Sequence, residues 1–136
     1  MENEIKFRAW DKQSNKMFEV VGIDFNDLEV SYTTKGIVKG GKKEEDWNDL
    51  IEVEIMQFTG LTDKNDKDIY EGDILESEYN GNHSVVFRDG AFCIKHVNEA
   101  DWSRGCCKPW RGRNLSEQCN LEEVIGNIYE NPELIK

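Results

Sequence analysis

Residues 57–74 read QFTGLTDKNDKDIYEGDI, and this segment decides the fold because it places acids and turn formers between apolar and aromatic ends. The stretch from Asp63 to Lys67 has the composition of a tight turn, and Tyr70 to Ile74 predicts the entry to a strand. The same acids are also the residue types of a metal-binding loop or of paired catalytic carboxylates. The spacing of the side chains distinguishes these three interpretations.

The spacing excludes a calcium loop. Asp63, Asn65 and Lys67 follow the first, third and fifth positions of an EF-hand loop. The sixth position, which needs glycine for a sharp turn, is Asp68, and the twelfth, which needs a bidentate glutamate, is Ile74. We therefore interpret the acids as a solvated face on a connection between strands, and we expect neither a metal nor a cofactor.

Glu71 and Asp73 flank Gly72, so their side chains would point to one face if this segment were a strand. Paired carboxylates on one face can separate their pKa values and act as an acid and a base. They support an alternative, an enzyme of unknown reaction, for which His83 is a third candidate residue. We favour the simpler interpretation that these residues form a turn, and we assign no catalytic residue.

Alternating apolar and polar residues on both sides of the segment predict a mainly β protein. Asn80-Gly81 and Asp89-Gly90 are strong hairpin signals, because both positions of such turns favour a positive φ, so residues 73–97 should form a three-stranded meander. The predicted strands are residues 5–10, 17–25, 28–33, 51–55, 73–79, 83–88, 91–97 and 124–129.

Many short strands with tight turns favour a small barrel or sandwich, with a single domain over residues 1–136 and one modest core. The meander resembles that of an SH3-like barrel. Helices are expected only as short turns, at 47–50 and 116–123. Residues 34–46 and 98–114 lack a regular pattern, so we expect both as irregular loops.

Four motifs occur in an order that suggests a family. They are Arg8-Ala9-Trp10-Asp11, the segment 57–74, VFRDGAF at 86–92 and VIGNIYENPEL at 124–134. Together they resemble the YopX family of small bacteriophage and prophage proteins. The resemblance implies no assigned activity, cofactor or catalytic residue. The central turn of that family commonly reads Asp-Lys-Asn-Gly-Lys. Asp66 stands here in place of the glycine, and because aspartate tolerates left-handed backbone we expect the turn to form at a small cost.

The formal net charge is −11 and the isoelectric point is about 4.6. A field of this sign repels phosphate backbones and anionic membranes, so no membrane partner is expected. Nucleic acid could bind only through a local basic patch. No basic and apolar leader or membrane-spanning stretch is visible, and we expect a cytoplasmic protein of a bacterial host with reduced cysteines.

Residues 102–113 form such a basic segment, with four positive charges, two tryptophans and no acid. Arginine and tryptophan are enriched at binding hot spots, arginine suits phosphate, and tryptophan can stack on a base. The alternative is a loop that folds back on the protein's own acids. The predicted binding residues are Trp102, Arg104, Lys108, Trp110, Arg111 and Arg113.

The cysteines do not follow the spacing of a zinc site, which needs paired ligands a few residues apart. Cys93 and His96 are three residues apart and would face opposite sides of a strand. Cys106, Cys107 and Cys119 could form a site with His96 across a loop, but free thiols are the interpretation that we favour.

We expect a phage or prophage accessory protein that binds a host or phage macromolecule, with a protein partner favoured, and that is not an enzyme. A second candidate surface is an acidic one. A third interpretation is a structural homo-oligomer that buries Trp10, Trp47 or Trp110 at a symmetric interface. The predicted acidic surface consists of Asp63, Asp66, Asp68, Glu71 and Asp73.

Overall fold

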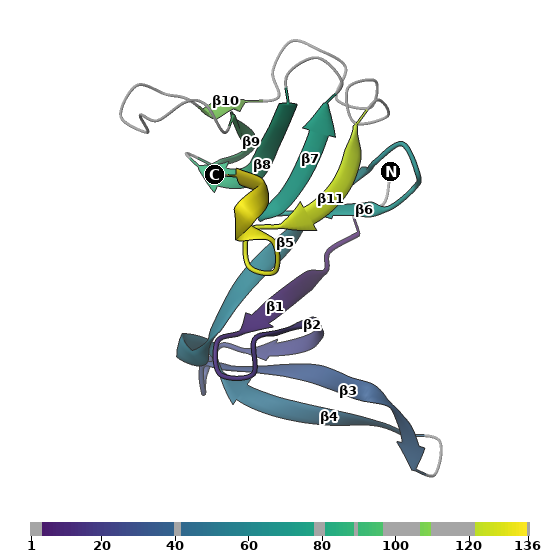
Figure 1. Cartoon of the computed structure of the whole chain (residues 1–136). Helices are drawn as coiled ribbons and strands as arrows, with labels where there is room; N and C mark the ends of the chain where they lie inside the picture. The colour runs from purple at the N-terminus through teal and green to yellow at the C-terminus, as the bar shows by residue number, and fades with distance from the viewer. Residues whose placement is uncertain are drawn as a thin grey trace. The chain divides into compact units, whose positions relative to one another are not determined.

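The chain folds into two antiparallel sheets, shown in Figure 1 as a computed structural model. The structure describes residues 4–39, 42–77, 81–88, 90–96, 107–109 and 122–135, with backbone alone at 33–39, 42–46, 77, 96 and 107–109. The strand orders are β4-β3-β2-β1-β5-β6 and β10-β9-β8-β7-β11. The chain divides into two compact units, which we call the N-terminal unit (Ile5–Gln57) and the C-terminal unit (Met1–Glu4 with Phe58–Lys136).

The described elements confirm a mainly β protein, and the helices among them are short turns; most of the helical turn predicted at 116–123 lies outside the described residues. The elements are β1 (Phe7–Asp11), β2 (Lys16–Asp24), β3 (Glu29–Lys39), β4 (Lys42–Asp49), the 3-10 turn η1 (Leu50–Glu52), β5 (Val53–Thr62), β6 (Asp68–Tyr70), β7 (Asp73–Ser77), β8 (Gly81–Arg88), β9 (Ala91–His96), β10 (Cys107–Pro109), β11 (Glu123–Asn127) and the 3-10 turn η3 (Pro132–Ile135).

Neither sheet closes on itself among the described residues, so the closed-barrel alternative is wrong. The resemblance to an SH3-like barrel stays a prediction. The single domain also stays a prediction, and the chain within it divides into two compact units. No helix in the described part of the chain is long and apolar enough to cross a membrane.

The N-terminal unit is built on β1, which pairs with β2 on one side and with the first half of β5 on the other. Ala9 of β1, Val30 of β3 and Val53 of β5 are buried together as its core. The partly buried residues packed against them are Val20, Ile23, Leu50 and Ile55. Ala9 and Val53 thus lie on the buried face that the alternation predicted, whereas Ile5 and Ile51, at the starts of the predicted strands, lie outside β1 and β5 and are exposed.

Residues 34–46, predicted as an irregular loop, lie in β3 and β4, apart from 40–41, which are outside the described residues. The two strands pair from Glu29↔Asp49 to Lys39↔Lys42, with an irregularity after Thr33. A hairpin ladder satisfies its own backbone hydrogen bonds and needs no apolar alternation, so the polar sequence concealed it. The helical turn expected at 47–50 begins three residues later, at Leu50.

The C-terminal unit contains the predicted meander, in which β8 pairs with β7 and with β9. β11 pairs with the other edge of β7. A core forms from Ile69, Leu75, Val85 and Val124, with Leu61 and Phe92 packed against it. The single core expected from the chain length is thus two clusters, one in each unit. Residues 107–109, predicted as part of a loop, form β10 and pair with β9.

Asp66 and Gly72, in the segment 57–74, adopt positive φ values at turns. Asp66 has φ of 60°, so it adopts the left-handed backbone expected where the family has glycine. Gly72 has φ of 85°, and its N–H donates to the Val85 carbonyl at 2.7 Å. Its own carbonyl accepts from the Ile128 N–H at 2.9 Å, so Gly72 connects the entry of β7 to the residues after β11.

Substitution of Asp66 tests the backbone requirement of the turn. Asp66→Val should lower the free energy of unfolding by about 1–2 kcal/mol, because a β-branched residue incurs the steric cost of left-handed backbone. Asp66→Gly should leave it unchanged or raise it, since glycine adopts this conformation freely. Chemical denaturation of both variants measures the difference, and an equal loss in the two would contradict the turn as described.

Candidate functional site

The turn after β5 is organised by the buried carboxylate of Asp63, which is 1% exposed. Its Oδ1 accepts hydrogen bonds from the backbone N–H groups of Asn65 at 2.8 Å and Lys67 at 2.9 Å. Its Oδ2 accepts from the N–H of Val124 in β11 at 2.9 Å. Two of these bonds close the turn locally, and the third joins it to a strand 61 residues further along the chain.

The same turn covers the free edge of β11. The N–H of Lys64 donates to the carbonyl of Glu122 at 3.1 Å, beside the Asp63–Val124 bond. The side chain of Glu123 accepts from Asn65 Nδ2 at 3.3 Å and lies 3.5 Å from Lys64 Nζ. An uncovered outer strand presents unpaired backbone groups that invite association, and the turn satisfies two of them here, the Val124 N–H and the Glu122 carbonyl.

The pKa of Asp63 is lowered by this arrangement. Burial, the largest single effect, raises the pKa. The N–H groups of Val124, Lys67 and Asn65 and the charge of Lys67 together lower the pKa by more, so the net direction is downward. The charged form of the carboxyl is therefore the one that the fold stabilises. A carboxylate held this way is a structural acceptor and a poor proton donor.

Asp73 is also a turn cap, and Glu71 and Gly72 do not lie in a strand, so the condition under which Glu71 and Asp73 would share one face is not met. β6 ends at Tyr70, so Glu71 and Gly72 form the connection to β7. The Oδ2 of Asp73 accepts from the Tyr70 N–H at 2.8 Å, and Asp73 is buried. The structure thus has a turn at Glu71 and Gly72, as the favoured interpretation of the sequence expected.

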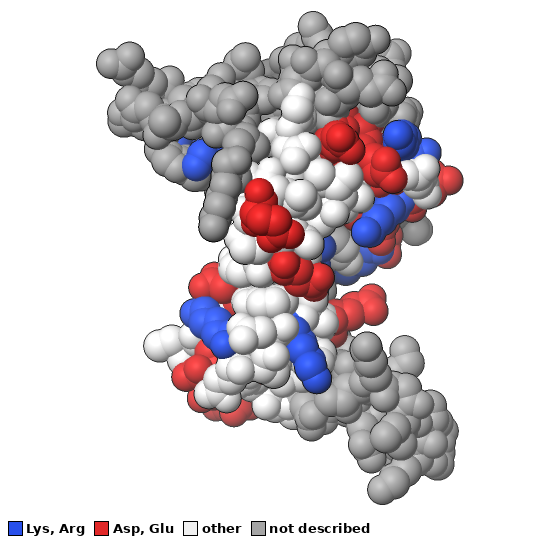
Figure 2. Space-filling view, in the orientation of Figure 1, with Lys and Arg blue, Asp and Glu red and all other residues white. Residues whose placement is uncertain are grey.

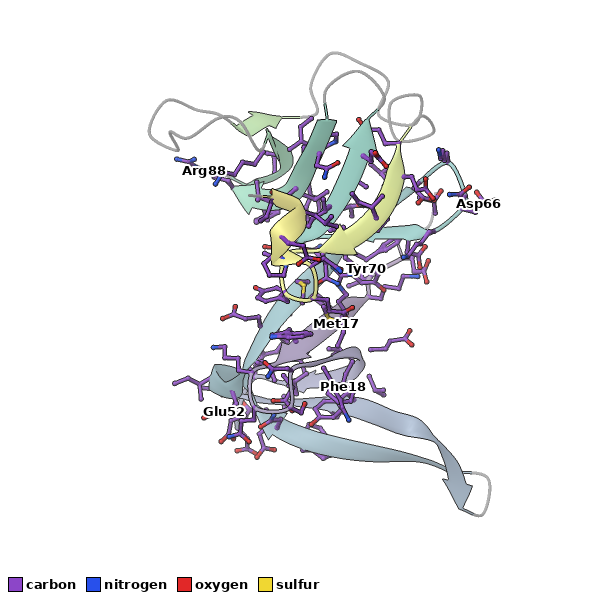
Figure 3. All side chains as sticks on the ribbon, viewed as in Figure 1. Met17, Phe18, Glu52, Asp66, Tyr70 and Arg88 are labelled. Carbon is purple, nitrogen blue, oxygen red and sulfur yellow. The ribbon has the colours of Figure 1, made fainter. Side chains whose placement is uncertain are left out.

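The five residues of the predicted acidic surface differ in exposure. Asp63 and Asp73 are buried, Asp68 and Glu71 are half-buried, and Asp66 is exposed. Figure 3 shows Asp66 at the outer end of the loop between β5 and β6. An acidic surface here would therefore consist of the last three. No group of three or more potential metal ligands occurs among residues whose side chains are described.

A buried pair that the sequence did not indicate joins His83 of β8 to Glu122, just before β11. His83 Nε2 lies 3.0 Å from Glu122 Oε2, and the side chains are 1% and 6% exposed. His83 pairs with Leu75 across the sheet, and Leu75 pairs with Val124, so the pair spans three neighbouring strands. Sequence reasoning singled out His83 but had no signal for Glu122, whose partner is 39 residues away.

The basic segment is largely outside the described residues, which exclude Trp102, Arg104, Trp110, Arg111 and Arg113. The backbone of Lys108 lies in β10, opposite Ile94 of β9. Cys106 and Cys119 are also outside the described residues, and Cys93 is a buried free thiol. The binding role of this segment stays a prediction.

The YopX family model, described as YopX protein, matches residues 6–136. The chain belongs to the YopX family. A similar solved structure is the crystal structure of protein EF1440 from Enterococcus faecalis, which is 28% identical, with 99% of this chain and 100% of that chain covered and a TM-score of 0.64. A comparison with curated proteins gave no match.

The first and last motifs of this YopX protein also contain turn caps. Asp11 of the first motif accepts from the Gln13 N–H and the Ser14 hydroxyl, both at 2.9 Å. In the last motif, Asn127 Oδ1 accepts from the N–H groups of Tyr129 at 3.0 Å and Glu130 at 2.9 Å. The polar residues by which the family is recognised thus hold backbone turns rather than converge on one site.

Replacement of Asp63 tests the central cap of this YopX protein. Asp63→Asn should lower the free energy of unfolding by about 2–3 kcal/mol at neutral pH, because the amide NH₂ group must face a backbone N–H that the carboxylate oxygen accepted. Asp66→Asn is the matched control, with the same charge change in the same turn. It should stay within about 0.5 kcal/mol of the unaltered protein, because Asp66 is exposed and asparagine tolerates left-handed backbone.

The loss in Asp63→Asn should also depend on pH. Since the folded state lowers the pKa of Asp63, its contribution is fully present above the unfolded pKa and is lost as pH falls through the folded value. The stability difference between the two proteins should therefore shrink below about pH 3.9, the ordinary pKa of aspartate. Denaturation curves over a pH series measure it, and a difference that grows on acidification would contradict the cap.

A double-mutant cycle tests the buried pair. His83→Leu or Glu122→Leu alone should lower the free energy of unfolding by about 3 kcal/mol, because each leaves a polar partner buried without its hydrogen bond. The double variant should lose clearly less than the sum, since no unsatisfied partner remains. Additive losses would show that the two side chains do not act as a pair.

Proposed function

We propose that this YopX protein is a non-enzymatic binding module of a bacteriophage or prophage, acting in the host cytoplasm on a protein partner. The observation that carries the proposal is a set of exposed apolar side chains at one end of the N-terminal unit. We call Phe25, Leu28 and Ile51 the apolar tip; their exposed fractions are 78%, 60% and 80%.

The apolar tip is assembled from two segments that are far apart in the chain. Phe25 and Leu28 begin and end the turn between β2 and β3, and Asp24 pairs with Glu29 directly behind it. The N–H of Leu50, in η1, donates to the carbonyl of Leu28 at 2.8 Å. This bond places Ile51, the next residue of η1, beside the turn. Scattered apolar residues are common on protein surfaces, but neighbouring ones in two linked segments suit an interaction site.

The backbone at the apolar tip supports the same proposal. Leu28 has φ of 54°, a left-handed conformation that a bulky apolar residue rarely adopts and that glycine or asparagine would adopt more easily. Burial cannot compensate for this conformation, because the Leu28 side chain is exposed. A strained and exposed apolar residue is the kind of local exception that points to function rather than to folding.

An enzymatic function is less well supported. Asp73, one of the two acids of the candidate Glu71/Asp73 pair, is buried and accepts a backbone hydrogen bond in a turn, as the buried Asp63 also does. The His83–Glu122 pair has the composition of a general base with its orienting acid. Such a base must reach a substrate proton, however, and both side chains are closed to solvent.

Two earlier interpretations stay as further proposals. Nucleic acid binding through residues 102–113 would give a gel shift that disappears as salt is added. A homo-oligomer is the other, with Trp47 as an exposed aromatic residue of β4 at 52% exposure. The apolar tip has the additional support that two described segments form it.

Affinity capture from phage-carrying cells, followed by mass spectrometry, tests the function. Phe25→Ser/Ile51→Ser should lose the captured protein while the unfolding midpoint stays unchanged, because neither side chain is buried. Ile5→Ser is the control, because Ile5 is also 78% exposed but lies before the start of β1. The apolar tip is at the other end of β1, where Lys12 donates to the Ile51 carbonyl. Equal capture of the partner by the unaltered protein, by Phe25→Ser/Ile51→Ser and by Ile5→Ser would contradict the proposal.

A further inference from the structure

We infer that the apolar tip binds a protein segment in which apolar side chains are flanked by lysine or arginine. The inference rests on the proposed function and adds the chemistry of the partner. The observation that supports the inference is the charge around Phe25, Leu28 and Ile51. All charged residues in the two segments that form the tip are acidic.

Residues 24–29 read DFNDLE and residues 49–54 read DLIEVE, so the tip segments contain six acids and no basic residue. Asp27, Asp49 and Glu54 are exposed, and Asp24, Glu29 and Glu52 are half-buried. Figure 2 shows acidic and basic side chains among uncharged ones in this unit, and Figure 3 labels Glu52, the last residue of η1. A partner that covers the apolar residues must therefore meet the exposed carboxylates of the same two segments.

Only part of this charge is compensated within the described residues. Lys12 Nζ lies 3.1 Å from Glu54 Oε1 and also donates to the Ile51 carbonyl at 3.1 Å. Asp24 Oδ1 accepts from the Asn26 and Asp27 N–H groups at 2.8 and 3.1 Å, so this carboxylate holds the turn. Asp27 and Asp49 remain as exposed acids on either side of the Leu28–Leu50 hydrogen bond.

Charge complementarity selects the occupant. Apolar contact supplies most of the affinity of an interface, and opposite charges at its rim supply the association rate and the choice of partner. A second copy of this chain would bring two acidic rims together, and like charges across an interface are costly. Anionic lipid and nucleic acid are repelled for the same reason. A basic, apolar protein segment satisfies both the centre and the rim.

Short synthetic peptides added to the full chain test the inference through amide chemical shifts. The first peptide alternates leucine and lysine, the second replaces lysine with glutamate, and the third replaces leucine with serine. The first should shift the amides of residues 24–29 and 49–52 and bind at least about tenfold more tightly than the other two. Its binding should weaken as salt rises, because the rim is exposed.

Asp27→Lys/Asp49→Lys should weaken the leucine–lysine peptide by about tenfold and leave the unfolding midpoint unchanged, since it reverses two exposed charges. Lys16→Glu is a control charge reversal at an exposed position outside the tip, and it should not weaken binding. Equal binding of the lysine and glutamate peptides, shifts confined to other residues, or no binding at millimolar peptide would overturn the inference.

Two further measurements identify a different occupant. Self-association that Phe25→Ser abolishes would show that a second copy covers the tip, and binding to vesicles of anionic lipid would show a membrane surface; each overturns the inference. If Phe25→Ser/Ile51→Ser loses cellular capture but the peptides show no preference for lysine, the proposed function stands and the partner chemistry is wrong. If capture persists in that variant, both are wrong.

Discussion

The hydrogen bonds of the Asp63 carboxylate are the constraint on which the C-terminal unit depends. One buried side chain accepts the backbone N–H groups of Asn65 and Lys67 in its own turn and of Val124 in β11. Without it, the turn after β5 would lose its internal acceptor and the outer edge of β11 would lose its cover. Because Val124 also belongs to the core with Leu75, the polar contact and the apolar packing fix the same strand.

The same kind of turn cap occurs in the first, central and last family motifs. Asp11, Asp63 and Asn127 each accept the N–H group of a residue two positions later in a turn, and Asp73 accepts the N–H group of Tyr70, three positions earlier. Aspartate and asparagine suit this role because a short side-chain acceptor reaches the backbone two residues on. Their concentration in the motifs marks where the chain reverses direction. Function is then better sought where apolar residues are exposed without a structural reason, as at Phe25, Leu28 and Ile51.

Much of the fold could be predicted from local sequence, because its signals are local. The alternation around Ala9 and Val53, the meander of β7 to β9 and the left-handed Asp66 all depend on neighbouring residues. The hairpin of β3 and β4 was missed, since backbone pairing between polar strands has no apolar pattern. The Asp63–Val124 and His83–Glu122 contacts were missed for another reason: they join residues 61 and 39 positions apart, and no spacing rule connects them. The apolar tip likewise exists only because the Leu28–Leu50 bond brings η1 to a turn.

A titration of the Asp63 side chain tests the central constraint directly. The carboxyl carbon of Asp63 and the amides of Asn65, Lys67 and Val124 can be followed by NMR in the folded protein as the pH is lowered. Three backbone donors on one buried carboxylate predict a pKa below the ordinary aspartate value, with all four signals changing at the same pH. A pKa at or above the ordinary value would mean that burial outweighs the hydrogen bonds, and it would contradict Asp63 as the residue that holds β11 to the turn.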